Sequence, residues 1–193
     1  MGNWIIIGLV GPIASGKGVI AEHLRIMDYT YQSLSDRVRE ETIRLGLESS
    51  RVNLQNVGNQ LRKQYGPAVL AERTVKLLKS TKENTVIDSI RNPSELSYLR
   101  NNLKAIIIGV DAPEELRLKW YLDRARERGE DPATSKDFFT ANLRDLGIGE
   151  DQSGQQVSAC LAMADYIIHN TGSKQELCDQ LIEIISSNNR RLK

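Results

Sequence analysis

Cysteine, histidine and proline are scarce in this sequence. Its 193 residues include two cysteines, two histidines and five prolines. The spacing of Cys160 and Cys178 matches neither a metal-binding nor a redox motif, and two distant cysteines exclude a disulfide framework. We therefore expect a reduced, cytoplasmic protein whose stability depends on a packed core.

Long apolar runs and an excess of one charge are also missing. No run approaches the roughly 18–20 residues that cross a bilayer, and the first residues lack the basic segment of a signal peptide. Lysine and arginine total 26 against 25 for aspartate and glutamate, a formal net charge of +1. This balance argues against general binding to polyanions. We expect neither a nucleic acid polymer nor a membrane as a partner.

Alternating strand and helix patterns fill the chain. Apolar residues make up 40% and charged residues 26%, which is typical of one globular domain, here spanning residues 1–193. Short apolar runs predict strands at residues 5–10, 29–34, 85–88, 105–110 and 166–168. Helical spacing and cap residues predict helices over residues 17–27, 36–45, 54–80 and 111–128, and the helix over 54–80 is broken at Gly66-Pro67. Two further helices are predicted to begin at Asn92 and at Ser173. This order predicts an α/β fold with a five-stranded parallel sheet flanked by helices.

The segment Gly11–Lys17 fits the pattern G-x-x-x-x-G-K and stands between the first predicted strand and the first predicted helix. Glycines let successive backbone N–H groups turn around phosphate oxygens, the helix N-terminus adds positive potential, and the lysine reaches the terminal phosphates. A glycine turn with a solvated lysine is the alternative interpretation. We predict a nucleotide-phosphate site formed by Gly11, Ala14, Ser15, Gly16, Lys17, Gly18 and Val19.

One position departs from the usual pattern of this loop. A serine or threonine normally follows the lysine and binds Mg²⁺, but Gly18 and then Val19 stand there. A Mg²⁺ ion that accompanies ATP would then be held by nucleotide oxygens, water and a carboxylate elsewhere. The sequence therefore leaves the metal ligands unassigned.

Three further segments resemble a known family. They are Ser35–Arg39, with the sequence SDRVR, then Asp88–Arg91, with the sequence DSIR, and the arginines Arg124 and Arg126 before a polar loop. Together with Lys17-Gly18 they resemble the nucleoside monophosphate kinases, a group of P-loop kinases. The Asp-x-x-Arg spacing of Asp88 and Arg91 is one residue shorter than the spacing in that group.

Other segments are similar to the dephospho-CoA kinase-like branch of P-loop kinases and to the kinase-type domain fused to some deoxycytidylate deaminases. These segments are Gly58–Arg62, Tyr65–Pro67 and Asn170–Ser173. The zinc signature of the deaminases is missing, because His23 is followed by Leu24-Arg25. The Asp-Ala-Asp element of dephospho-CoA kinases is missing too, which weakens the coenzyme A precursor as a substrate.

The resemblance implies that ATP donates its γ-phosphoryl group to a nucleoside or deoxynucleoside monophosphate. It assigns acceptor binding to an insertion at about residues 36–80 and a lid to about residues 124–150. The implied catalytic residues are Lys17, Asp88, Arg91, Arg124 and Arg126. The implied acceptor-binding residues are Asp36, Arg39, Arg62 and Arg91, and Asn170 and Gly172 would lie beside the base of the donor nucleotide.

Plainer interpretations stand beside these roles. Asp36 opens a predicted helix and would serve as its cap, and Arg91 would form an ion pair with Asp88.

Two other functions also remain open. One is a dephospho-CoA kinase-like enzyme, in which Asp36 or Asp88 would be the base for a ribose hydroxyl. The other is a nucleotide-binding regulatory module that transfers no phosphoryl group. The oligomeric state, monomer or homodimer, is also open.

Overall fold

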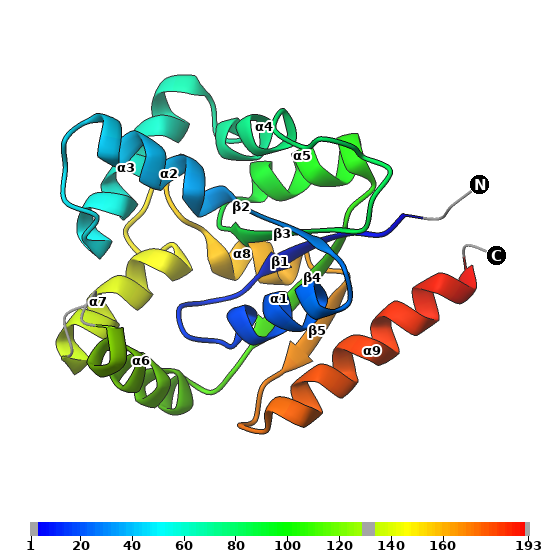
Figure 1. The fold of residues 1–193 in the computed structure, drawn as a ribbon. Coiled ribbons are helices and arrows are strands. Elements are labelled where there is room, and N and C mark those ends of the chain that lie inside the picture. Colours follow the sequence, from blue (N-terminus) through cyan, green and yellow to red (C-terminus); the bar gives the residue numbers. More distant parts are fainter. Residues whose placement is uncertain (1–3, 129–133, 192–193) are drawn as a thin grey trace.

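The computed structural model describes residues 4–128 and 134–191. Five parallel strands form one sheet in the order β2-β3-β1-β4-β5 (Figure 1). The strands are β1 (Ile6–Val10), β2 (Thr30–Ser33), β3 (Thr85–Ile90), β4 (Ile106–Asp111) and β5 (Tyr166–His169). The five strands predicted from apolar runs are therefore confirmed, as is the parallel sheet.

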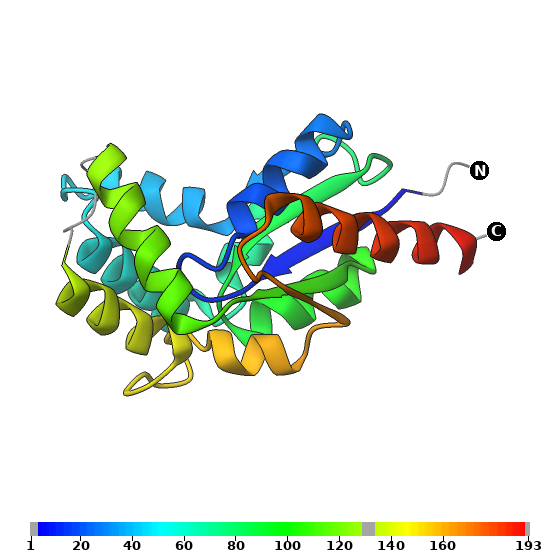
Figure 2. The ribbon, with the colours of Figure 1, turned by 90° about the horizontal axis from the view of Figure 1, so that it is seen from below.

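Helices cover both faces of this sheet. They are α1 (Lys17–Ile26), α2 (Leu34–Arg44), α3 (Arg51–Tyr65), α4 (Val69–Val75), α5 (Pro93–Leu103), α6 (Glu114–Arg128), α7 (Ser135–Leu146), α8 (Val157–Ala162) and α9 (Lys174–Arg191). In Figure 2, α1 and α9 lie on one side of the sheet, and α5 and α8 lie on the other. This two-sided cover explains why the three central strands β1, β3 and β4 are buried along nearly their whole length.

The central strand β1 contributes side chains to the apolar clusters on both faces of the sheet. Ile7 and Leu9 are buried in the cluster that includes Ile20 and Leu24 of α1 and Leu177 of α9. Ile6 and Val10 point to the opposite face, where they join apolar residues of α2, α3, α4, α5 and α8. The alternation follows from the two-residue period of a strand.

Local caps move two of the predicted helix boundaries. Ser33 Oγ accepts a hydrogen bond from Ser35 N at 3.3 Å, so α2 begins at Leu34, and the cap is Ser33 instead of Asp36. Ser50 Oγ accepts from Asn53 N at 3.3 Å and starts α3 before the predicted residue 54. The chain then breaks at Gly66, which has a φ of 102° and separates α3 from α4 as predicted.

Helices α6 and α7 stand at the end of the sheet where β1 runs into the glycine loop (Figure 1). Tyr121 of α6 and Phe138 of α7 pack with ring centroids 5.4 Å apart, and Ile13 of the loop joins their cluster. Residues 129–133 of the predicted lid lie outside the described residues. Among the described helices, none is long and apolar enough to cross a membrane.

Candidate active site

The glycine loop connects β1 to α1 and needs its glycines. A Cβ atom on Gly11 would collide with the carbonyl oxygen of Val110. Gly16 has a φ of 104°, in the left-handed region, and a Cβ there would collide with the amide nitrogen of Asn170. Asn170 Nδ2 in turn donates a hydrogen bond to the Ser15 carbonyl at 3.0 Å, so the segment after β5 supports the loop.

Lys17 is the first residue of α1 and its ammonium group lies against the loop. Its Nζ donates hydrogen bonds to the carbonyl oxygens of Gly11 at 2.6 Å and Pro12 at 2.9 Å. Burial lowers the pKa of Lys17 to about 8, while the nearby carboxylates of Asp88 and Asp145 act in the opposite direction. A phosphate anion at this position would favour the charged form and raise the pKa again.

A cleft of about 840 Å³ opens beside the loop. This cleft brings together predicted site residues that belong to segments far apart in the chain. Of the predicted site residues, those that line it are Ala14, Ser15, Gly16, Lys17, Gly18, Val19, Asp36, Arg39, Asp88, Arg91, Arg124, Asn170 and Gly172.

The carboxylate of Asp88 faces this cleft from near the end of β3. Tyr31 OH donates a hydrogen bond to its Oδ2 at 3.3 Å, and Ser89 N donates to its Oδ1 at 2.6 Å. Burial and the Asp88 charge raise the pKa of Tyr31 to about 12, so the phenol keeps its proton. Ser89 has a φ of 66°, a conformation that non-glycine residues rarely adopt and that is often found at functional sites.

Arg91 is fixed at three points. Its backbone N–H donates to Glu95 Oε2 at 2.9 Å, and its carbonyl accepts from Gln156 N at 2.6 Å. Its guanidinium forms an ion pair with Asp145 of α7, not with Asp88 as the plainer interpretation had it. The backbone of Arg91 is therefore held by residues from α5 and the segment before α8, and its side chain is held by α7.

Three predicted site residues do not line the large cleft: Gly11 of the loop, Arg62 and Arg126. Arg126 is 71% exposed and pairs with Asp123 at 3.7 Å, because it points away from the face of α6 that carries Arg124. Arg62 is buried in an ion pair with Glu95, whose Nε to Oε1 distance is 2.7 Å. Arg62 instead lines a second, smaller cavity.

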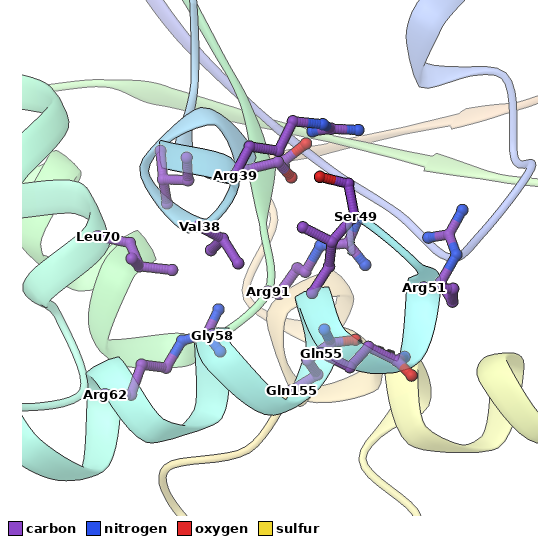
Figure 3. Close-up of a pocket in the computed structure, with 14 residues that line it drawn as sticks. Val38, Arg39, Ser49, Arg51, Gln55, Gly58, Arg62, Leu70, Arg91 and Gln155 are labelled. Atoms are coloured by element: carbon purple, nitrogen blue, oxygen red, sulfur yellow. Dashed lines mark hydrogen bonds between the residues drawn. The ribbon is translucent and has the colours of Figure 1, made fainter. Parts of the chain in front are cut away.

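This smaller cavity, of about 100 Å³, adjoins the cleft (Figure 3). Its walls come mainly from α2, α3 and α4, within the insertion predicted at residues 36–80. Five residues line both the small cavity and the large cleft: Ser35, Arg39, Arg51, Ser89 and Arg91. The two spaces therefore share a boundary that carries three guanidinium groups.

Sequence reasoning missed four residues of this region: Arg51, Gln55, Asp145 and Gln155. Arg51 and Gln55 stand on α3, Asp145 near the end of α7, and Gln155 in the segment before α8. Asp145 and the two glutamines are almost fully buried, although their side chains are polar. Gln55 could have been found only if its position on the apolar face of a helix had been recognised. An isolated polar residue does not reveal such a position, because most polar residues are exposed.

The described residues fit a nucleotide phosphate better than they fit a metal held by protein ligands. Ser15 Oγ is sealed inside the loop without a hydrogen-bond partner, which leaves a donor beside the phosphate cradle. Across residues 4–128 and 134–191, no group of three histidine, cysteine or acidic side chains is placed to hold a metal ion. Gly18 offers no hydroxyl for Mg²⁺, and the carboxylates that line the cleft are those of Glu22, Asp36 and Asp88.

Comparisons with known proteins find relatives of this chain over most of its length. No family model matches the sequence. A UPF0200 protein of Thermococcus gammatolerans is 34% identical over 178 residues, covering 89% of this chain and 89% of that protein. A UPF0200 protein of Aeropyrum pernix is 34% identical over 177 residues, covering 91% of this chain and 89% of that protein.

Solved structures share the fold at lower identity. Shikimate kinase from Acinetobacter baumannii superposes with a TM-score of 0.57 at 18% identity, over 96% of this chain and 95% of that one. A sugar kinase from Janibacter superposes with a TM-score of 0.53 at 11% identity, over 95% of each chain. The fold is that of the P-loop kinases, as the resemblance to nucleoside monophosphate kinases implied.

Proposed function

Because the chain belongs to the UPF0200 family and has the fold of P-loop kinases, we propose that it transfers the γ-phosphoryl group of ATP to a nucleoside or deoxynucleoside monophosphate. The observation that carries this proposal is the boundary between the two cavities. Arg39, Arg51 and Arg91 line both spaces. A phosphate bound there would face the terminal phosphate of a nucleotide on the loop, with cations around both.

On the donor side, the backbone N–H groups of residues 14–18 and the ammonium of Lys17 would hold the β- and γ-phosphates. Asn170, which is hydrogen-bonded to the Ser15 carbonyl, would border the base of ATP together with Gly172. Asp88 would hold Mg²⁺ through bound water. When bound, this ion would neutralise part of the phosphate charge.

On the acceptor side, Arg39 and Arg91 would fix the acceptor phosphate in line with the γ-phosphorus, and Asp36 would border it. An acceptor oxygen forms the new bond to phosphorus while the bond to the bridging oxygen of ADP breaks. The second pKa of a phosphate monoester is about 6, so the nucleophile is already ionised and needs no base. This fits a cleft that neither His23 nor His169 lines.

The end of α6 from Arg124 onward and helix α7 would form the lid that excludes water during transfer. Arg124 lines the cleft and would neutralise oxygens of the transferred group. Arg126 is not part of this proposal, because its side chain is exposed outside the cleft and pairs with Asp123.

A hydroxyl acceptor is the second candidate, as in a dephospho-CoA kinase-like enzyme. It is favoured by the carboxylate of Asp88, which faces the cleft and would take the proton that such an acceptor must lose. Hydrogen bonds from Tyr31 OH and Ser89 N already reach both oxygens of this carboxylate, which leaves fewer free positions for an incoming proton. We therefore rank this candidate below a phosphate acceptor.

Formation of ADP tests the proposal. ATP is offered with CMP, UMP, AMP, GMP and their deoxy forms, and separately with dephospho-CoA and shikimate. We expect turnover with at least one monophosphate and a loss of 100-fold or more in Lys17→Ala, the scale of lost transition-state charge stabilisation. Lys119→Ala, an exposed lysine of α6, is the control. Turnover only with dephospho-CoA or shikimate would favour the hydroxyl acceptor, and ATP binding without turnover would favour a regulatory module.

A further inference from the structure

The small cavity ends in a pair of glutamine side chains that the proposed transfer chemistry does not use. Gln55 of α3 is 4% exposed and Gln155 is 5% exposed, and both line the cavity. Gln55 Nε2 donates hydrogen bonds to Gln155 Oε1 and to the Ala141 carbonyl, each at 3.3 Å. Two long amides from opposite parts of the chain are thus held against one another.

Each amide keeps one polar group unused. Within residues 4–128 and 134–191, no protein donor reaches Gln55 Oε1 and no protein acceptor reaches Gln155 Nε2. Neither atom is among the polar atoms sealed from solvent without a partner, and both side chains line the cavity. The wall of the cavity therefore carries an amide pair that still has one carbonyl acceptor and one amide donor available, and such groups favour a ligand that completes their hydrogen bonds.

The rest of the small cavity limits what that ligand can be. Leu34, Val38, Leu54 and Leu70 contribute apolar walls from three different helices. A flat ring with apolar faces and a polar edge suits these walls and the amide pair together. Figure 3 shows Arg39 well apart from the two glutamines, so an anionic end and a polar edge would occupy opposite ends of one ligand.

We propose that Gln55 and Gln155 bind the hydrogen-bonding edge of the acceptor's nucleobase and thereby select the acceptor. The proposal rests on the proposed function and extends it to the residues that determine specificity. The Gln55 carbonyl would accept from an amino group or ring N–H of the base, and the Gln155 amide would donate to the neighbouring ring nitrogen or carbonyl. Every nucleobase offers such an adjacent donor and acceptor.

Binding measurements without ATP test this inference apart from catalysis. The dissociation constants of CMP, UMP, AMP and GMP are compared with that of ribose 5-phosphate, which keeps the sugar and phosphate but lacks the base. We expect at least one nucleotide to bind more tightly than ribose 5-phosphate. In Gln155→Leu this advantage should fall about 10-fold or more, because the base loses a hydrogen bond in a buried place. Ribose 5-phosphate should bind as it does to the wild type.

The control and a second variant separate recognition from folding. Gln64→Leu, an exposed residue of the same helix α3, should change no dissociation constant. Gln155→Glu keeps the shape of the side chain but replaces its donor with an acceptor, so the order of preference among the four nucleotides should change. Equal weakening of nucleotide and ribose 5-phosphate, an unchanged order in Gln155→Glu, or no advantage of any nucleotide in the wild type would each overturn the inference. If one of these results overturns the inference but a monophosphate still accepts a phosphoryl group from ATP, the proposed function stands. If no monophosphate accepts a phosphoryl group, the proposed function is refuted, whatever the binding measurements show.

Discussion

The charge of Lys17 depends strongly on its position in the loop. Burial lowers its pKa from 10.5 to about 8. Between pH 8 and 10.5 the unfolded chain therefore binds more protons at this position than the folded chain does, so folding becomes more favourable as the pH rises, by up to about 3 kcal/mol. We expect the unfolding free energy of the wild type, measured with urea, to rise relative to that of Lys17→Met between pH 8 and pH 10. A constant difference would contradict the lowered pKa.

The same lysine predicts a pH dependence for nucleotide binding. A triphosphate beside Lys17 favours the ammonium form and raises its pKa again. Binding of a non-hydrolysable ATP analogue should therefore take up protons just above pH 8 and weaken as the pH rises further. Calorimetry in two buffers of different ionisation enthalpy measures this uptake. Lys119→Met should retain it, and Lys17→Met should abolish it.

Loss of the Arg91 side chain should affect the acceptor much more than it affects ATP. Arg91 lines both cavities, and Asp145 and Glu95 hold it in place. In Arg91→Ala we expect kcat/KM for the acceptor to fall 100-fold or more while the dissociation constant of ATP changes less than about threefold. Arg91→Lys should recover only part of the loss, because an ammonium cannot form the two parallel bonds of a guanidinium. Similar losses for ATP and acceptor would contradict this placement.

At the scale of elements, the ends of two helices predict opposite effects of one substitution. Lys104 caps the C-terminus of α5 with a φ of 53°, in the left-handed region, whereas Lys76 caps the C-terminus of α4 with a φ of −62°. Both lysines are exposed. Lys104→Gly should stabilise the fold by about 0.5–1 kcal/mol because glycine adopts this conformation without strain, and Lys76→Gly should destabilise it by a similar amount. Thermal unfolding of both variants checks the sign of each change.

The elements were more predictable than the site. Apolar runs located the central strands because both faces of the sheet are covered there, and the cap at Asn92 was visible because Asn92, Pro93 and Glu95 stand close together in the sequence. The boundaries at Leu34 and Arg51 were missed because Ser33 and Ser50, serines inside polar segments, turned out to be the caps.

The glycine loop was predictable because its chemistry lies in consecutive residues. The acceptor cavity was not, because its walls come from residues that are far apart in the chain. Gln55 meets Gln155, and Arg91 meets Asp145, only after α3, α7 and the segment before α8 have packed together. Arg126 was assigned to the site because it shares a motif with Arg124, but the turn of α6 directs the two side chains to different faces.

At the scale of the whole molecule, one buried carboxylate joins three segments. Glu95 of α5 is fully buried and pairs with Arg62 of α3, and its Oε2 accepts from the backbone N–H groups of Arg91 and Asn92 at 2.9 and 3.1 Å. It therefore fixes the loop after β3 and the helix that walls the acceptor cavity at the same time. Removing one partner of such a pair leaves an uncompensated charge in the core.

Glu95→Leu should therefore lower the unfolding free energy by about 3–5 kcal/mol, as should Arg62→Met. The double variant should lose clearly less than the sum of the two, because no lone charge is left, although Arg91 N and Asn92 N still lose their acceptor. Urea unfolding of the four proteins gives the coupling. The exposed pair Glu22–Arg25, whose side chains are 61% and 59% exposed, is the control and should change stability by less than about 1 kcal/mol in the same cycle. Additive losses at positions 62 and 95 would show that the two side chains stabilise the fold independently, and that α3 and α5 are not joined through this pair.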